Sequence, residues 1–412
     1  MARRAQDDRR GLAWRLVGQP LTRTVKWIVA LGFLVICWPI ALISRLVPKR
    51  FDIGLGPEPL INNIYHKRAL ESHGYTAETF VDQVWFITSD FDYRGDLKFG
   101  GLLALIRPYA LCVRALFRYR CLYIYFNGGP LMSAPLAWRA EPSLLRVAGV
   151  RVVVMPYGGD VQVMSRSKNL PFRHAKAVDY PESRFRERRV EQQIDLWTTH
   201  ADHVISGVEW VDYMYFWDTL MLGHFSIDPD SWESAATPRP VDGTLRIFHA
   251  PNHRAIKGSD HFIRAVEELR AEGVDVELVM RERVPNEVIR QTMGEVDAVA
   301  DQLIVGWYAM FALEAMAMGK PVLCYLRKDL LDLYEAEGLL GHGEMPILNC
   351  DPLSVKETIR SLAADRSQLA GIAERGKAYV RKHHSIEAIG GVFDRINREV
   401  GIAPSKQRAD AH

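Results

Sequence analysis

The stretch LRIFHAPNHRAIKGSDHFIRAVEELRAEGVDVELVM, residues 245–280, contains a complete strand–helix–strand unit, from which the fold of the chain is predicted. Its first apolar run, 245–250, is typical of a buried strand, and the run 274–280 predicts another. Between them, the residues 260–272 have the spacing of an amphipathic helix. Strands that alternate with covering helices form parallel sheets, so the stretch predicts an α/β fold.

The same alternation continues on both sides of this stretch. Short apolar runs predict strands at 122–126, 150–155, 203–206 and 322–326, and the last of these follows a predicted helix over 309–318. Open α/β sheets bind ligands at the carboxyl ends of their strands. The residues that directly follow strands are therefore the candidates for function.

Length and linker composition predict two domains. A chain of 412 residues is too long for one hydrophobic core. The polar, proline-containing stretch 228–243 is typical of an interdomain linker. We expect a membrane-associated segment over 1–50, an N-terminal Rossmann-like domain over 51–235, a C-terminal Rossmann-like domain over 240–385, and a final helix and tail over 386–412.

Composition excludes several classes of protein. Hydrophobic residues at 48% and charged residues at 25% are typical of globular proteins, and a net charge of +2 gives no reason to expect nucleic acid as a partner. The five cysteines are scattered and never spaced as metal pairs, which favours a reducing compartment. The two Asp-x-Asp triplets, 90–92 and 228–230, are interpreted as acids in loops. We therefore expect no metal and no other cofactor.

The segment Trp27–Ser44 carries no charge. As a straight helix it would extend roughly 27 Å, against about 30 Å of bilayer hydrocarbon. Basic residues flank both of its ends, and Pro39 can break the helix so that the segment enters and leaves on one side. We therefore expect a monotopic attachment to the cytoplasmic face of the inner membrane. The alternative is a buried helix of a soluble domain.

A cluster of cations in the loop HAPNHRAIKGSD points to a phosphate group. Arg254 and Lys257 follow a strand, and Gly258 leads into the next helix. Two cations, a glycine and a helix N-terminus form a suitable site for a diphosphate. The alternative is a solvated basic loop.

Glu314 is an acid within the apolar helix AMFALEAMAM, where a charge is costly without a partner. Its carboxylate could accept two hydrogen bonds from a ribose diol. The alternative is a salt bridge in the core.

These residues resemble the donor half of retaining GT-B glycosyltransferases of the group-1 family, also called family 4. The likeness rests on HRAIKG, on VDAVADQ and on the block ALEAMAMGKPV, and extends more faintly to GPEPLINNIYHKRALESHGY and MPYGGDV in the first half. It implies two Rossmann-like domains that face a central cleft. It also implies that Arg254 and Lys257 hold the phosphates of a nucleotide-sugar donor and that Glu314 holds its ribose.

The sequence departs from the family in two places. Where the family carries a first glutamate before Glu314, this chain has Gly306, and where a glycine is common it has Ala309. The contact with the donor sugar must then come from elsewhere, with Asp301 or Gln302 as candidates.

In the first domain, the family often has a histidine near the reacting carbon, and Tyr157 occupies roughly that place. Asp160 follows the same strand and could orient an acceptor hydroxyl. Gly56 lies in a loop that could approach the donor or the acceptor, because glycine permits close backbone approach. An ordinary tight turn is the alternative for both loops.

The predicted function is transfer of a hexosyl or related sugar, with retention, from a nucleotide-diphosphate donor to a lipid-linked or cell-surface glycan in bacterial polysaccharide biosynthesis. One alternative is a membrane-bound scaffold that keeps the fold without catalysis, which Gly306 suggests. The other alternative is a sugar-nucleotide epimerase, which needs a donor but no acceptor.

Overall fold

The computed structural model describes residues 19–84, 88–233 and 243–405. The N-terminal part of the predicted segment 1–50 lies outside these residues, as do the predicted division between 235 and 240 and the end of the tail. By internal contacts the chain divides into two units. One comprises Met1–Met155, Gln193–Val204 and Ile396–His412, and the other comprises Pro156–Gln192 and Ile205–Arg395. The domain boundaries expected from the sequence stay a prediction.

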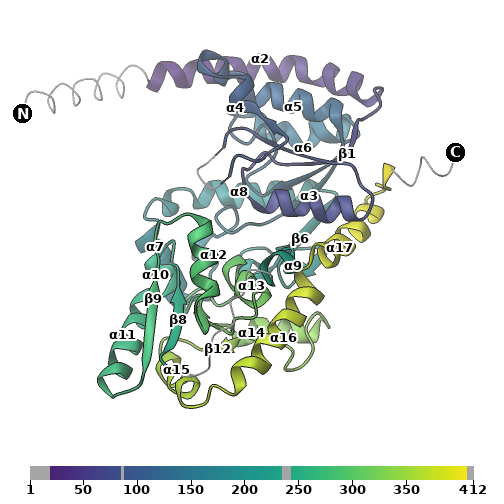
Figure 1. Ribbon diagram of the computed structural model, residues 1–412. Helices are drawn as coiled ribbons and strands as arrows, with labels where there is room; N and C mark the ends of the chain where they lie inside the picture. The colour runs from purple at the N-terminus through teal and green to yellow at the C-terminus, as the bar shows by residue number, and fades with distance from the viewer. Residues whose placement is uncertain (1–18, 85–87, 234–242, 406–412) are drawn as a thin grey trace, which may run out of the picture. The chain divides into compact units, whose positions relative to one another are not determined.

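The first sheet has seven strands in the order β3-β2-β1-β4-β5-β6-β7, all parallel (Figure 1). They are β1 (Phe51–Leu55), β2 (Ala77–Val81), β3 (Tyr93–Arg94), β4 (Tyr119–Tyr125), β5 (Arg151–Met155), β6 (His203–Gly207) and β7 (Thr219–Met221). Its central strands β1, β4 and β5 are almost entirely buried, because helices cover both faces of a parallel sheet. The strands predicted at 122–126, 150–155 and 203–206 are confirmed, with each end within three residues of the prediction.

Helices accompany the strands of this sheet in the expected alternation. They are α2 (Gln19–Arg45), α3 (Asn62–Ser72), α4 (Gly95–Lys98), a 3-10 helix (Gly101–Leu105), α5 (Arg107–Arg118), α6 (Ala137–Val147), α7 (Leu170–Asp179), α8 (Glu187–His200) and α17 (Ile386–Glu399). Short 3-10 helices span Met164–Arg166, Ser183–Phe185 and Val208–Asp212.

The helix α2 runs without interruption through Pro39, so the expected break at this residue is wrong. Pro39 is exposed to solvent. A proline removes one backbone hydrogen bond but need not end a helix. The buried residues Cys37 and Ala41 hold α2 on its own domain on both sides of Pro39. Among the described residues, Arg23–Arg45 is the one helix long and apolar enough to cross a membrane.

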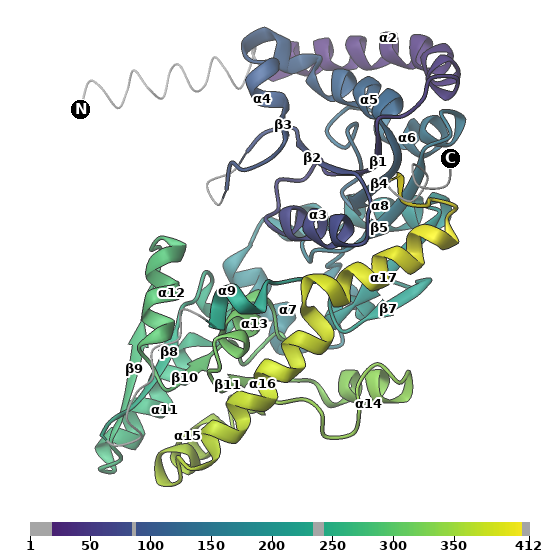
Figure 2. The same cartoon turned by 45° about the vertical axis from the view of Figure 1, so that its right-hand side comes forward.

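The second sheet has five parallel strands in the order β12-β11-β10-β8-β9 (Figure 2). They are β8 (Leu245–His249), β9 (Val276–Met280), β10 (Ala298–Ala300), β11 (Val322–Cys324) and β12 (Leu348–Asn349). The helices of this part are α9 (Pro229–Glu233), α10 (Arg254–Lys257), α11 (Ser259–Ala271), α12 (Asn286–Gly294), α13 (Met310–Ala317), α14 (Lys328–Ala336), α15 (Val355–Ala364) and α16 (Gln368–His384).

The core of this sheet confirms the strand–helix–strand unit that was predicted from residues 245–280. Ile247 of β8 and Val276 of β9 pack with Phe262 and Leu269 of α11 in one buried cluster, to which α15 adds Ile359. Burying each such side chain contributes about 1.5–3 kcal/mol. The two parallel sheets with covering helices are the two Rossmann-like folds that the sequence predicts.

Candidate functional site

The loop after β8 forms a single helical turn that ends in a left-handed glycine. Gly258, with φ +70°, caps α10 and joins it to α11. A Cβ at Gly258 would lie 3.1 Å from side-chain atoms of Leu303 and Ile304, and the amide of Leu303 donates to the carbonyl of Lys257 at 3.1 Å. The cationic turn is therefore packed against the residues that follow β10.

Lys257 and Asp301 form an ion pair at the carboxyl ends of the strands. The Lys257 Nζ lies 2.5 Å from the Asp301 Oδ1. The Asp301 carboxylate is fully buried, whereas the Lys257 side chain is 19% exposed. The structure thus brings together two residues that the sequence singled out separately, and it leaves the ammonium within reach of solvent.

Arg254 also has an acidic partner, and the sequence did not point to it. Its guanidinium donates from Nε and Nη2 to the two carboxylate oxygens of Glu282, each at 2.9 Å. Glu282 lies two residues after β9, so its place near a strand end was the available signal. Both members of this pair are exposed, and such pairs contribute little to stability and exchange readily for another partner.

Glu314 is half-buried on α13, and its carboxyl makes no hydrogen bond or ion pair to any residue that the structure describes. Burial first, and then the charge of Asp301, raise the pKa of Glu314 to about 8, and Arg290 partly opposes this shift. The core salt bridge considered as the alternative does not form among the described residues. Asp301 is thus paired with Lys257 and close enough to Glu314 to affect its ionisation.

The loop 302–309 between β10 and α13 is held by the buried side chain of Gln302. Its Oε1 accepts hydrogen bonds from the amides of Ile304 and Val305, and its Nε2 donates to the carbonyls of Trp307 and Tyr325. All of these contacts are 2.7–3.1 Å long. Because both ends of the carboxamide are engaged in shaping the loop, Gln302 is a poor candidate for the sugar contact.

Gly306 lies at the tip of this loop with φ +95°. A Cβ there would lie 2.6 Å from the Cγ and Cδ of Arg327 and 3.5 Å from the Asn169 Nδ2. No glutamate fits this backbone and these neighbours without rearrangement. Ala309, at the other end of the loop, is the extended N-cap of α13.

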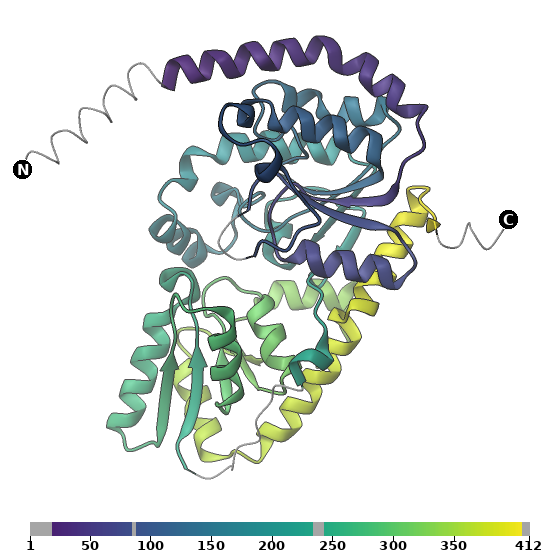
Figure 3. The ribbon, with the colours of Figure 1, turned by 45° about the horizontal axis from the view of Figure 1, so that its top comes forward.

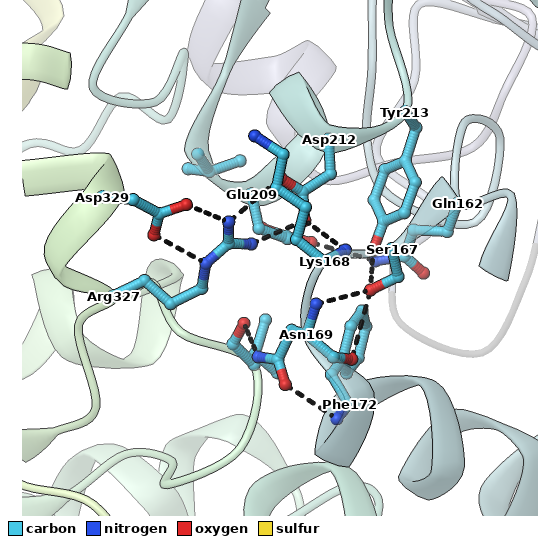
Figure 4. A network of polar contacts seen from close by, with 12 residues as sticks. Gln162, Ser167, Lys168, Asn169, Phe172, Glu209, Asp212, Tyr213, Arg327 and Asp329 are labelled. Atoms are coloured by element: carbon cyan, nitrogen blue, oxygen red, sulfur yellow. Dashed lines mark hydrogen bonds and ion pairs between the residues drawn. The ribbon is translucent and has the colours of Figure 1, made fainter. Parts of the chain in front are cut away.

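Arg327 belongs to a buried polar network that the sequence did not indicate (Figure 4). Its guanidinium contacts both carboxylate oxygens of Asp212, at 2.6 and 3.1 Å, and both of Asp329, at 3.0 and 2.6 Å. The Nδ2 of Asn169 donates to the carbonyls of Ile304 and Val305 at 2.7 and 3.1 Å. These bonds tie the glycine-containing loop to residues far away in the sequence.

The predicted acceptor residues surround the turn after β5. The carboxylate of Asp160 accepts hydrogen bonds from the amides of Tyr157 and Gly158, each at 2.9 Å, so it stabilises the turn in which it lies. Tyr157 is half-buried. These contacts show an ordinary tight turn, which was the alternative considered for this loop. A role of Tyr157 and Asp160 in acceptor binding stays a prediction.

A buried charged cluster lies beside this turn. Gln162 donates to the Glu209 Oε1 at 3.0 Å and accepts from the Lys176 Nζ. Burial raises the pKa of Glu209 to about 7 and lowers the pKa of Lys176 to about 8. The sequence did not single out these residues, because their positions form no motif.

The remaining sequence candidates have contacts of their own. Gly56 has no room for a side chain, because a Cβ would lie 1.9 Å from the Phe80 carbonyl oxygen. Of the two acidic triplets, Asp92 pairs with Lys67 at 2.7 Å and Asp230 pairs with Arg381 at 2.6 Å. No group of three His, Cys, Asp or Glu side chains in the described part of the chain could hold a metal ion.

Comparisons with known proteins place this geometry in a known fold. No protein-family model and no curated protein matches the sequence. Among solved structures, a sucrose-phosphate synthase from Thermosynechococcus elongatus is similar, with a TM-score of 0.52 and 14% identity over 85% of this chain and 99% of that one. An alpha-glucosyltransferase in complex with UDP-glucose and DNA gives 0.51 and 13% over 85% and 100%. WaaG, a glycosyltransferase involved in lipopolysaccharide biosynthesis, gives 0.50 and 12% over 84% and 99%.

These neighbours are GT-B glycosyltransferases, so the predicted GT-B fold is confirmed. At identities of 14% or less, the likeness shows the fold alone.

Proposed function

We propose that the chain is a glycosyltransferase that moves a hexosyl or related sugar from a nucleotide-diphosphate donor. The observation that carries this proposal is the pairing of Lys257 with Asp301 at 2.5 Å, at the strand ends of a GT-B fold and close to the unpartnered carboxyl of Glu314. Lys257 and Arg254 both hold carboxylates. A donor diphosphate would take the place of these carboxylates, because phosphate offers the same kind of acceptor oxygens.

In this proposal the cations stabilise the leaving group. As the bond between the anomeric carbon and the phosphate oxygen breaks, its electron pair goes to the diphosphate. Lys257 and Arg254 neutralise the negative charge that develops there. Glu314 receives the ribose hydroxyls, and Gly258 lets the backbone approach the phosphates closely. No metal or other cofactor takes part in this scheme.

The donor sugar then lies near the loop that begins at Asp301. Gly306 and Ala309 place no long side chain on it, so Asp301 is the remaining acid that could contact the sugar. In the first half, Tyr157 and Asp160 would face the acceptor, and the loop of Gly56 would approach the donor or the acceptor. The acceptor is a lipid-linked or cell-surface glycan in bacterial polysaccharide biosynthesis, and transfer proceeds with retention.

Attachment to the cytoplasmic face of the inner membrane completes the proposal. A lipid-linked acceptor lies in the bilayer surface, whereas nucleotide sugars are cytosolic in bacteria. The helix α2, with a mean hydropathy of 2.3 over its candidate span, supplies the apolar element.

The substitution Lys257→Met tests the function. It removes the ammonium but keeps most of the side-chain volume, and it leaves the buried Asp301 carboxylate without this partner, so thermal unfolding is measured alongside activity. In the folded variant, release of nucleoside diphosphate from a panel of nucleotide sugars should be lost. Lys328→Met is the matched control, because Lys328 is 85% exposed and its ion pair is with Asp332 one helical turn away. Unchanged turnover in Lys257→Met would count against the proposal.

A non-catalytic scaffold is the second candidate, since the neighbours of Gly306 leave no space for the family's glutamate. Calorimetry with nucleotides discriminates the two: a scaffold binds none, whereas a transferase binds and turns over. Analysis of the products formed from the donor alone detects an epimerase.

A further inference from the structure

The helix α2 has two faces of different character within the first unit. A stripe of small and apolar residues is buried against α5 and α6: Ala30, Phe33, Cys37, Ala41 and Ser44. The ring of Phe33 lies 4.8 Å from that of Tyr109 on α5. The Lys49 Nζ donates to the carbonyls of Ser44 and Leu116, which joins the end of α2 to the end of α5. These contacts fasten the helix lengthwise to its own domain.

The opposite face of α2 is apolar and exposed. Val35 is 76% exposed and Leu42 is 57% exposed, and the same face includes Ile28, Leu31, Ile36 and Ile43. At 100° a residue, these positions lie on the side opposite to Ala30 and Cys37. Isolated exposed apolar residues are ordinary, but a continuous strip of this length on one helix indicates an interaction surface.

The charges and aromatic residues around this face indicate its occupant. Trp27 and Trp38 lie at its margin, each 38% exposed, and tryptophan prefers the level of lipid head groups. The helix contains no acidic residue, whereas Arg23, Lys26 and Arg45 are exposed at its ends. Apolar side chains bordered by indoles and cations complement an anionic bilayer surface better than they complement an ordinary protein surface.

We propose that α2 lies in the plane of an anionic membrane surface, with the face of Val35 and Leu42 inserted and the face of Ala30 and Cys37 retained on the domain. This inference rests on the proposed membrane attachment and specifies its geometry. Figure 3 shows α2 as the purple helix lying along neighbouring helices of its own unit rather than projecting from them. A spanning helix would instead have to leave α5 and α6, break the hydrogen bond from Lys49 to the Leu116 carbonyl and uncover the buried stripe that includes Ala30 and Cys37.

The segment that leads into α5 carries further exposed apolar residues. Leu97 on α4, Leu103 on the 3-10 helix and Ile106 at the start of α5 are exposed, and Lys98 stands among them. They precede the helix on which α2 packs, so they bring further apolar and basic groups to the same domain.

Flotation with lipid vesicles tests the inserted face. The full chain should float with vesicles of phosphatidylcholine and phosphatidylglycerol, less with phosphatidylcholine alone, and less at high salt. The double substitution Val35→Glu, Leu42→Glu should abolish flotation while leaving thermal unfolding and nucleotide binding unchanged. Leu353→Glu is the matched control, because Leu353 is 92% exposed in a loop outside this unit. Undiminished flotation of the double variant would overturn the proposal. Loss of a dimer in the double variant, measured without lipid, would also overturn the proposal, because a second copy of the chain would then cover this face of α2.

Labelling distinguishes an in-plane helix from a spanning one. The five native cysteines are buried, so single substitutions Arg23→Cys and Arg45→Cys give defined labels at the two ends of α2. The protein is bound to the outer surface of sealed vesicles, and a membrane-impermeant maleimide is then added to the solution. The maleimide should react with both positions. Protection of one end alone would show a spanning helix and overturn the in-plane geometry. Neither result depends on turnover, so this inference and the proposed function fail separately.

Discussion

The side chain of Arg327 occupies the space next to Gly306 in which any other residue would place its Cβ. That atom would lie 2.6 Å from both the Cγ and the Cδ of Arg327. The arginine is held where it is by Asp212 and Asp329. Gly306 is therefore required by the packing of Arg327. This packing accounts for a glycine at the position where the glycosyltransferase pattern has a glutamate.

Gly306→Ala should destabilise the protein. The new methyl group would meet Arg327, and φ +95° disfavours any residue with a side chain. We expect a loss of about 1–3 kcal/mol in the free energy of unfolding, measured by urea denaturation. Gly338→Ala is the control, because Gly338 has φ +68° with no atom within 4 Å of its Cβ position. Equal losses in the two variants would show that contact with Arg327 is unimportant.

Breaking the ion pair between Arg327 and Asp212 should be costly, because both side chains are almost fully buried. Asp212→Asn or Arg327→Met should each lower the free energy of unfolding by about 3–5 kcal/mol, since each leaves a buried charge with fewer partners. The double variant should lose less than the sum. Arg151→Met, which removes a pair whose arginine is 55% exposed, should cost about 0–1 kcal/mol. Additive losses would contradict a direct coupling.

Glu314→Gln should stabilise the protein increasingly as the pH rises. Burial raises the pKa of Glu314 from 4.5 to about 8 in the folded protein, with Asp301 adding to the shift. Between these pH values the unfolded chain gives up this proton while the folded chain retains it, so the wild type loses stability with rising pH. Glutamine removes that loss. The gain in melting temperature over the wild type should therefore grow from pH 5 to pH 8.

Glu344→Gln provides the contrast. Hydrogen bonds from Lys382 and His383 hold the pKa of Glu344 at about 2, despite some burial. Its stabilising contribution is therefore present above the ordinary value of 4.5 and is lost only as the pH falls toward 2. The variant should be less stable than the wild type at both pH 5 and pH 8. A gain from Glu314→Gln that did not change with pH would rule out the proposed ionisation.

Local patterns in the sequence predicted the fold well. The apolar runs that predict strands lie in β4, β5, β6 and β8 to within a few residues, because buried parallel strands are apolar on both faces. Lys257 and Asp301 were found for the same reason: Asp301 directly follows β10, Lys257 lies in the loop region after β8, and parallel strands bring their carboxyl ends to one edge.

Long-range contacts could not be predicted in the same way. Arg327 and Asp212 are separated by 115 residues, and nothing in either local sequence marks the other as its partner. The bidentate contact of Arg254 with Glu282 depends on the register of β8 and β9, which the sequence does not give. Pro39 was expected to break its helix because the sequence alone does not show that packing on both sides of it keeps α2 continuous.

Calorimetric titration with nucleoside diphosphates and nucleotide sugars tests the central claim most directly. The account predicts that the wild type binds at least one of them and that Lys257→Met weakens this binding by about ten- to a hundredfold, as expected for one charge-assisted hydrogen bond. A wild-type protein that binds no nucleotide diphosphate, or a Lys257→Met variant that binds as tightly as the wild type, would contradict it.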